Sequence, residues 1–209
     1  MVKKLSKSSL AVILSMLEGF KTPKVRVEQY SMDSETAAFV LWNGLYMRDI
    51  KGKVIADLGC GTGILGIGAL ILGASGVYFV DSDEDALKIA KKNLRLAKSE
   101  SSTVGKAIFI HKDINDFNEK VDVVVENPPF GTKVRHSDKV FLEKAVRLAP
   151  IVYSFHKSET RGFIEAFFRS KNYEITNVWD FKLSLKATLD YHKKRMHKIN
   201  VSCFRARRL

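Results

Sequence analysis

The segment that decides the fold lies at residues 54–63 and has the sequence Val-Ile-Ala-Asp-Leu-Gly-Cys-Gly-Thr-Gly. Its first five residues are apolar except for Asp57, as in a strand that is covered on both faces inside a parallel sheet. Glycines then follow at Gly59, Gly61 and Gly63, where a doubly wound sheet places the loop that binds a nucleotide. The segment therefore predicts an α/β domain with a ligand site at the carboxyl end of this strand.

Strands and helices alternate from this segment towards the C-terminus. We predict strands at residues 54–58, 77–80, 107–111, 121–125 and 151–155, and helices at residues 64–72, 83–98, 137–149 and 158–170. Residues 99–105 are rich in serine and predict a surface loop. Two β-rich segments at residues 173–181 and 199–204 favour an antiparallel hairpin that closes the sheet. The predicted fold is a doubly wound, Rossmann-like α/β domain with a mostly parallel, seven-stranded sheet.

The first 50 residues predict an extension of this domain. They contain an amphipathic helix around residues 10–14, a short extended piece at residues 25–30 and a second helix at residues 36–47. We expect this N-terminal helical extension, residues 1–50, to pack on the α/β domain formed by residues 51–209. The apolar runs are too short for a membrane span, and the N-terminal run lacks the cleavage site of a signal peptide, so we expect no membrane partner.

Acidic residues at the strand ends discriminate between two cofactors that a glycine loop could bind. The Gly-x-Gly-x-x-Gly pattern at residues 61–66 would also fit a dinucleotide. Asp57, however, stands directly before the glycines, where its charge would repel a pyrophosphate but attract the sulfonium and ammonium groups of S-adenosylmethionine. Asp81 can accept hydrogen bonds from ribose hydroxyls, and Asp113 can face an adenine amino group. We therefore predict an S-adenosylmethionine site formed by Asp57, Gly59, Gly61, Thr62, Gly63, Asp81, Asp113 and Ile114.

A second motif, Asn-Pro-Pro-Phe at residues 127–130, follows the fourth predicted strand at the same edge of the sheet. Residues that precede proline are held extended, so Asn127 and Pro128 lie in a rigid loop. The Asn127 side-chain oxygen and the Pro128 carbonyl can accept the two N–H groups of an exocyclic base amine and localise its lone pair for attack on a methyl group. Phe130 can stack on the base. The motif predicts a catalytic loop for amine methylation, formed by Asn127, Pro128, Pro129 and Phe130.

Together the two motifs resemble those of class I S-adenosylmethionine-dependent amino-methyltransferases. Three segments, residues 28–30 (Glu-Gln-Tyr), 127–133 (Asn-Pro-Pro-Phe-Gly-Thr-Lys) and 153–158 (Tyr-Ser-Phe-His-Lys-Ser), resemble more narrowly the methyltransferase-like family that places N6-methyladenosine on small-subunit ribosomal RNA in archaea and eukaryotes. The resemblance spans nearly the whole chain. It implies the class I methyltransferase fold, a contact between Gln29 and the cofactor, and a small zinc-binding activator subunit as a partner. That family often has threonine three residues after the glutamine, where this chain has Met32, whose side chain offers no comparable hydrogen bond.

The charge of the chain favours a polyanionic partner. Thirty-five lysines and arginines against 23 aspartates and glutamates give a net charge of +12. Cations concentrate near the C-terminus, at Lys186, Lys193, Lys194, Arg195, Lys198, Arg205, Arg207 and Arg208. We predict that Lys193, Lys194 and Arg195 bind RNA, with an ordinary solvated tail as the alternative. We assign the same role to His156 and Lys157 at the end of a strand, with a structural histidine as the alternative at His156.

The two cysteines, Cys60 and Cys203, stand far apart, and neither has a partner at the spacing of zinc ligands. We therefore expect no resident metal and no disulfide, and a reducing location such as the cytoplasm.

The sequence as a whole predicts methyl transfer to adenine N6 in structured RNA, above all small-subunit ribosomal RNA. A guanine-N2 RNA methyltransferase would use the same loop. A protein-glutamine N5 methyltransferase would also use Asn-Pro-Pro, commonly with tyrosine in place of Phe130 and with a longer N-terminal domain. An RNA-binding scaffold without catalysis is a further alternative. The three enzymes would each form a different methylated product, and the scaffold would form none.

Overall fold

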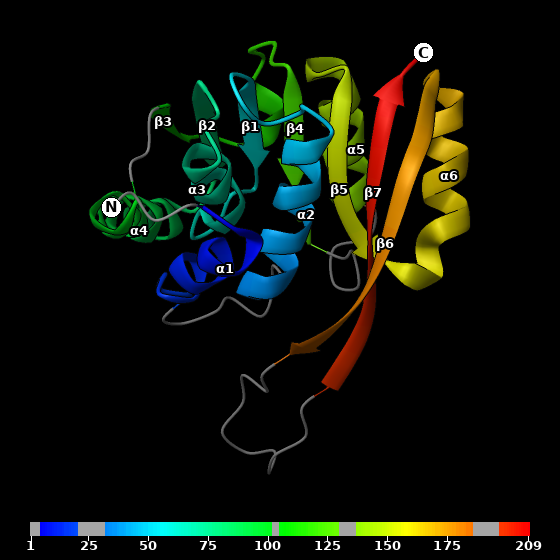
Figure 1. Ribbon diagram of the computed structural model, residues 1–209. Helices are drawn as coiled ribbons and strands as arrows, with labels where there is room; N and C mark the ends of the chain where they lie inside the picture. Colours follow the sequence, from blue (N-terminus) through cyan, green and yellow to red (C-terminus); the bar gives the residue numbers. More distant parts are fainter. Residues whose placement is uncertain (1–4, 21–31, 102–104, 130–136, 186–196) are drawn as a thin grey trace, which may run out of the picture.

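The computed structural model describes residues 5–20, 32–101, 105–129, 137–185 and 197–209. Within these residues a seven-stranded sheet forms the centre of the molecule, and helices cover both of its faces (Figure 1). No helix in the described ranges is both long and apolar enough to span a bilayer.

The strands lie in the order β3-β2-β1-β4-β5-β7-β6. They are β1 (Val54–Leu58), β2 (Gly76–Asp81), β3 (Lys106–His111), β4 (Val123–Glu126), β5 (Ile151–Lys157), β6 (Tyr173–Leu185) and β7 (His197–Arg208). β1 to β5 are parallel, whereas β7 runs antiparallel to both β5 and β6. The strand order reverses between β1 and β4, and ligands of open α/β sheets bind at the carboxyl ends of the strands at such a point. β6 and β7 extend beyond this edge (Figure 1).

Six α-helices in the described residues form the two outer layers. α1 (Lys7–Ser15), α2 (Ser34–Tyr46), α3 (Ile64–Ile71) and α4 (Glu84–Glu100) cover one face, and α5 (Ser137–Leu148) and α6 (Arg161–Ser170) cover the other. Successive residues of a strand face opposite layers, so Ile55 belongs to the core under α1 to α4, whereas Ala56 belongs to the core under α5 and α6.

Helix α4 illustrates how the sequence sets these layers. Asp83 caps the helix, because its carboxylate accepts the backbone N–H of Asp85 at 3.1 Å. Apolar residues then recur at helical spacing along the buried face, at Ala86, Leu87, Ala90, Leu94 and Ala97. The lysines and acids of α4 remain on the other side, so the helix buries one face on the sheet.

The predicted fold class is confirmed, with shifts at the ends of several elements. α4 continues to Glu100, so Ser99 and Glu100, which we expected in a loop, are helical. β5 continues to Lys157, two residues beyond its predicted end. The predicted helix at residues 158–170 begins as a 3₁₀ turn, Ser158–Thr160. The division of the chain at residue 50 stays a prediction, since α1 and α2 share one core with the sheet.

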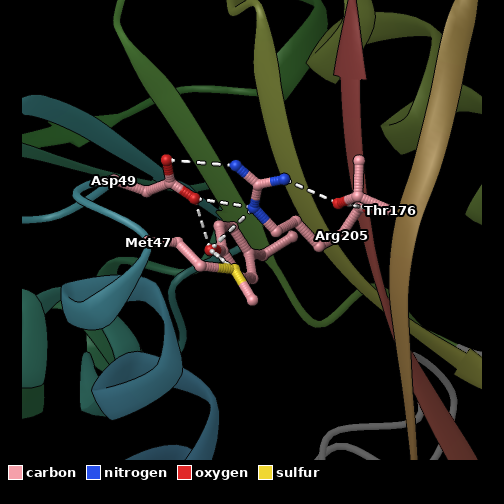
Figure 2. A network of polar contacts seen from close by, with 5 residues as sticks. Met47, Asp49, Thr176 and Arg205 are labelled. Carbon is pink, nitrogen blue, oxygen red and sulfur yellow. Dashed lines mark hydrogen bonds and ion pairs between the residues drawn. The ribbon is translucent and has the colours of Figure 1, made fainter.

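A buried ion pair joins the end of α2 to the C-terminal hairpin (Figure 2). Arg205 of β7 donates from Nε to Asp49 at 2.7 Å and from a terminal nitrogen to Thr176 of β6 at 2.6 Å. Asp49 also accepts the hydroxyl of Tyr153 at 2.5 Å. The side chains of Asp49 and Arg205 are only 4% and 10% exposed, so each charge depends on the other for compensation.

Replacing Arg205 by methionine should destabilise the protein strongly, because the buried carboxylate of Asp49 would lose its counter-ion. We expect the free energy of unfolding, measured by urea denaturation, to fall by about 3–5 kcal/mol. Arg207→Met is the matched control, because Arg207 pairs with Glu174 at the surface, with side chains 56% and 51% exposed. That control should lose less than about 1 kcal/mol. Equal losses in the two variants would contradict the role given to the buried pair.

Candidate functional site

A cavity of about 570 Å³ opens at the carboxyl ends of β1, β2 and β4. Its walls come from the glycine loop, the residues that follow β2, β3 and β4, helix α5 and two residues near α1 and α2, Phe20 and Met32. Six acidic residues line it, namely Asp57, Asp81, Asp83, Glu84, Asp85 and Asp113. In a chain of net charge +12, this local concentration of acid favours a cationic ligand over an anionic one.

The glycine loop adopts a backbone that glycine alone enters readily. Gly59, Gly61 and Gly63 have φ angles of 64°, 52° and 89°, in the left-handed region. Gly66, in the first turn of α3, excludes a side chain for another reason, since a Cβ atom there would overlap the ring of Phe79. The loop therefore brings its backbone close to the cavity, and α3 close to β2.

Asp57 lies at the end of β1 and is almost fully buried beneath the loop. One carboxylate oxygen accepts the backbone N–H of Gly66 at 2.8 Å. Burial raises the pKa of Asp57 to about 7, although the bond from Gly66 opposes this rise. Asp57 therefore anchors the start of α3, and it can gain or lose its charge near neutral pH.

Asp81, at the end of β2, holds the other side of the loop. Its two oxygens accept the backbone N–H groups of Gly61 at 2.7 Å and of Asp83 at 2.8 Å. Burial raises the pKa of Asp81 above its ordinary value. A carboxylate oxygen can accept a second hydrogen bond, and the ribose contact of Asp81 stays a prediction.

Asp113 and Ile114 line the cavity just after β3. Asp113 caps the 3₁₀ turn Ile114–Asp116 by accepting the N–H of Asn115 at 2.9 Å. Lys144 of α5 also holds this turn, because its ammonium donates to the carbonyls of Asn115 and Phe117 at 2.9 and 2.8 Å. This role of Lys144 could not be predicted from sequence, because its partners lie more than 25 residues away.

A buried asparagine on α4 joins the glycine loop to the segment that follows α1. Asn93 donates to the carbonyls of Thr62 at 3.0 Å and Glu18 at 2.9 Å, and it accepts the N–H of Glu18 at 2.8 Å. Phe20 then reaches the loop, since a Cβ atom on Gly61 would lie 2.8 Å from its ring. Neither Asn93 nor Phe20 was predicted as a site residue; for Asn93 the available signal was its position among the apolar residues of the buried face of α4. Gln29, the predicted cofactor contact, lies outside the described residues.

Asn127 and Pro129 line the same cavity as the acidic residues. Asn127 directly follows β4 and is half-buried, while Pro128 is buried. The structure thus brings these members of the predicted catalytic loop together with Asp57, Asp81 and Asp113. Phe130 lies outside the described residues. Phe141 of α5, which the sequence did not indicate, completes this wall.

The residues predicted to bind RNA fall into three groups. His156 is 1% exposed and its ring nitrogen bonds to Ser154, so it cannot reach RNA in this conformation, and that assignment is withdrawn. Lys157 follows it and is partly exposed. Lys193, Lys194 and Arg195 lie outside the described residues.

The three arginines of β7 belong to the fold, although we counted them with the basic tail. Arg205 is buried against Asp49, and Arg207 pairs with Glu174. Arg208 donates to the carbonyl of Val146 at 2.8 Å and to the hydroxyl of Tyr173 at 3.0 Å. Of the C-terminal cations, those that precede β7 or lie at its start are therefore the candidates for RNA contact.

Both cysteines are buried thiols, and burial raises the pKa of each. Cys60 occupies a loop position beside Asp57 and Asp81, whose charges raise its pKa further. A thiol held in its protonated form is a poor nucleophile, so Cys60 serves as a small loop residue.

Comparison with known proteins decides the family. The model of the ribosomal protein L11 methyltransferase (PrmA) family matches residues 35–128. The rRNA N(6)-adenosine-methyltransferases of Danio rerio and Drosophila melanogaster are 34% and 32% identical to this chain, over 92% of it in both cases and over 94% and 92% of the relatives. The chain belongs to the rRNA N6-adenosine-methyltransferase family.

Of two solved structures, the first agrees with this membership and the second shows the fold alone. A proposed RNA methyltransferase of Pyrococcus horikoshii superposes with a TM-score of 0.86 at 39% identity, over 97% of this chain and 98% of that one. Magnesium protoporphyrin IX methyltransferase of Synechocystis, crystallised with S-adenosylmethionine, shares the fold with a TM-score of 0.62 at 16% identity, over 84% of this chain and 79% of that one. The resemblance to the N6-adenosine family is confirmed, and the guanine-N2 and protein-glutamine alternatives are not favoured.

Proposed function

We propose that this protein transfers a methyl group from S-adenosylmethionine to the N6 amine of an adenine in structured RNA, specifically small-subunit ribosomal RNA. The observation that carries the proposal is that one cavity contains both the acidic glycine-loop pocket and Asn127 and Pro129 of the Asn-Pro-Pro-Phe loop, residues 127–130, called the acceptor loop from here on. Membership of the rRNA N6-adenosine-methyltransferase family supports the choice of adenine over guanine or a protein side chain.

The residues of the cavity fit S-adenosylmethionine. Bound there, the cofactor supplies a methyl group carried on a positively charged sulfur. Asp57 and the other five acidic residues complement its cationic groups, whereas they would repel the pyrophosphate of a dinucleotide. We assign Asp81 to the ribose hydroxyls, Asp113 and Ile114 to the adenine, and the backbone of Gly59, Gly61, Thr62 and Gly63 to contact with the ligand. We also keep Gln29 as a proposed contact.

The acceptor loop supplies hydrogen-bond acceptors for the amine that is methylated. The lone pair of an exocyclic amine is delocalised into the ring, which makes the nitrogen a poor nucleophile. The side-chain oxygen of Asn127 and the carbonyl of Pro128 would accept its two N–H groups, and this pairing favours the tetrahedral nitrogen of the transition state. Pro129 keeps the loop rigid, and Phe130 would stack on the base. Only an unpaired base can enter such a pocket, so we expect the target adenine to be flipped out or single-stranded.

RNA contact outside the pocket falls to exposed cations. Lys157 ends β5 at the same edge of the sheet as the cavity and retains partial exposure. Lys193, Lys194 and Arg195 stand between β6 and β7 in sequence, and these two strands extend beyond the same edge (Figure 1). We propose that these four residues bind phosphates of the RNA.

The side of the sheet formed by its outermost strand, β3, offers a surface for a partner protein. β3 is an edge strand, and its apolar residues Ala107, Ile108, Phe109 and Ile110 are all partly exposed. Such an edge can be extended by a strand of another chain. We propose that the small zinc-binding activator subunit suggested by the sequence resemblance binds there, and that the pair acts in the cytoplasm on ribosomal RNA.

Cofactor affinity should depend on pH through Asp57. A cationic ligand binds the ionised carboxylate, whereas the carboxyl keeps its proton below a pKa of about 7. The association constant for S-adenosylmethionine should therefore rise roughly eightfold between about pH 6 and pH 7.5. Asp57→Asn, which can still accept the N–H of Gly66, should bind more weakly and lose this pH dependence. Calorimetry measures both; an unchanged pH dependence in the variant would exclude Asp57 as its source.

Asn127→Ala should lower methyl transfer by at least about two orders of magnitude, the scale seen when a preorganised polar contact to a transition state is lost. Cofactor affinity should stay nearly constant, because Asn127 addresses the acceptor amine. The measurement is single-turnover transfer of labelled methyl to small-subunit ribosomal RNA. Full activity in the variant would remove the catalytic role of the loop.

Replacing Lys193, Lys194 and Arg195 together should weaken RNA binding at low salt. The slope of log affinity against log salt should become shallower by roughly two to three units, because that many phosphate contacts are lost. Arg207→Met is a charge control within the folded hairpin and should leave the slope nearly unchanged. If the slope is the same in the triple variant and the wild type, these cations are solvated and do not contact RNA phosphates.

A further inference from the structure

Directly beneath the acceptor loop lies a buried polar cluster that the proposed function does not use. Glu126 is the last residue of β4 and immediately precedes Asn127, and its side chain is completely buried. Ser154 lies opposite it in the register of β4 and β5. His156 is two residues further along β5, on the same face, and both β5 residues are also buried.

The cluster forms a directed chain of hydrogen bonds. Ser154 donates its hydroxyl to Oε1 of Glu126 at 2.7 Å. The oxygen of the same hydroxyl lies 2.6 Å from Nε2 of His156. With Ser154 donating its one hydrogen to Oε1, Nε2 of His156 takes the donor role toward Ser154, and the proton of a neutral Glu126 is on Oε2. Within the described part of the protein, the second oxygen of Glu126 is buried without any hydrogen-bond partner.

This environment favours the uncharged form of every member. Burial raises the pKa of Glu126 to about 8, although the bond from Ser154 opposes the rise. Burial lowers the pKa of His156 to about 3, so its ring is neutral. At neutral pH the carboxyl of Glu126 therefore keeps its proton.

The described elements around Glu126 bring no charge to it. β1 places Leu58 beside it, and Asp57 turns to the opposite face, towards Gly66 of α3. β7 places Phe204 against His156. On α5, Leu142 and Ala145 enter the core of this face. Of the charged residues of α5, Lys139 pairs with Glu143 near the surface, Lys144 binds the turn after β3, and Asp138 accepts the backbone N–H of Lys139 at 2.9 Å.

We propose that Glu126 is a positioning residue for methyl transfer, which is held by Ser154 and His156 and in turn fixes the acceptor loop that begins at Asn127. The inference rests on the proposed function of that loop. Glu126 and Asn127 share a peptide bond, so a displaced Glu126 side chain moves the backbone from which the Asn127 amide projects. A displacement of about 1 Å at a reacting group can lower a rate by about 100-fold. Ionised Glu126 would have a buried oxygen without a donor, so loss of its proton should loosen the loop.

The decisive variant is Glu126→Gln, which keeps the size of the side chain and an oxygen for Ser154 but cannot ionise. In the wild type, kcat should fall as pH rises through about 8, while KM for RNA changes little. In Glu126→Gln this alkaline fall should disappear. Glu165→Gln, at an exposed position of α6, is the matched control and should keep the wild-type profile. An alkaline fall at the same pH in Glu126→Gln and wild type would overturn the proposal.

A second measurement does not need RNA, so it separates this proposal from the proposed function. The folded pKa of Glu126 lies above its ordinary value of 4.5, so ionisation favours the unfolded chain and stability from this group declines as pH rises from about 4.5 to 8. The Tm of Glu126→Gln minus the Tm of the wild type should therefore increase as the pH rises across this range. A Tm difference that does not change with pH would overturn the proposal even if RNA methylation is confirmed.

Removal of the Glu126 side chain gives a third test of its positioning role. Glu126→Ala should lower kcat by roughly 10- to 100-fold, with KM for RNA and cofactor affinity within about twofold of the wild type. If this variant does not fold, Ser154→Ala removes the donor to Glu126 with a smaller change of volume and should lower kcat in the same way. A loss confined to KM, or unchanged kcat in a folded variant, would show that the cluster does not position the loop.

Discussion

The carboxylates of Asp57 and Asp81 accept backbone N–H groups of the glycine loop and of α3, and the geometry of the site depends on these bonds. Glycines have no side chains to pack, so the loop is held by hydrogen bonds: those to the two carboxylates, the bond from Asn93 to the carbonyl of Thr62, and the bond from the N–H of Cys60 to the carbonyl of Val80. The same two acids line the cavity, so the groups that shape the loop also supply the negative charge that a cationic ligand requires. Their burial raises both pKa values, which couples ligand binding to proton release.

The residues before β1 complete the cavity as well as covering the sheet. α1 and α2 bury Leu10, Leu14 and Leu41 in the core that also contains Ile55 and Phe79. Asn93 fixes the segment after α1 to the glycine loop, and Asp49 ties the end of α2 to β7 through Arg205. The cavity therefore depends on contacts between parts of the chain that are distant in sequence.

The sequence was sufficient for features that follow from periodicity and strand ends. Alternation of apolar strands and amphipathic helices predicted the sheet, and the rule that parallel strands end at one edge brought Asp57, Asp81, Asp113 and Asn127 together correctly. Roles set by distant tertiary partners, such as those of Lys144 and Asn93, could not be predicted. His156 was misassigned because we ended β5 at residue 155; two more residues of alternation place it on the buried face with Ser154. Arg205 was counted only as one of the C-terminal cations for a similar reason: the predicted strand ended at residue 204, whereas β7 continues through Arg205.

The identity of the methylated nucleoside tests the account most directly. Purified protein, together with its partner subunit if one is required, would be incubated with small-subunit ribosomal RNA and labelled S-adenosylmethionine, and the RNA would be digested to nucleosides for mass spectrometry. The account predicts label in N6-methyladenosine, with little in other nucleosides and none in ribosomal protein. Label in N2-methylguanosine, or in protein alone, would contradict it.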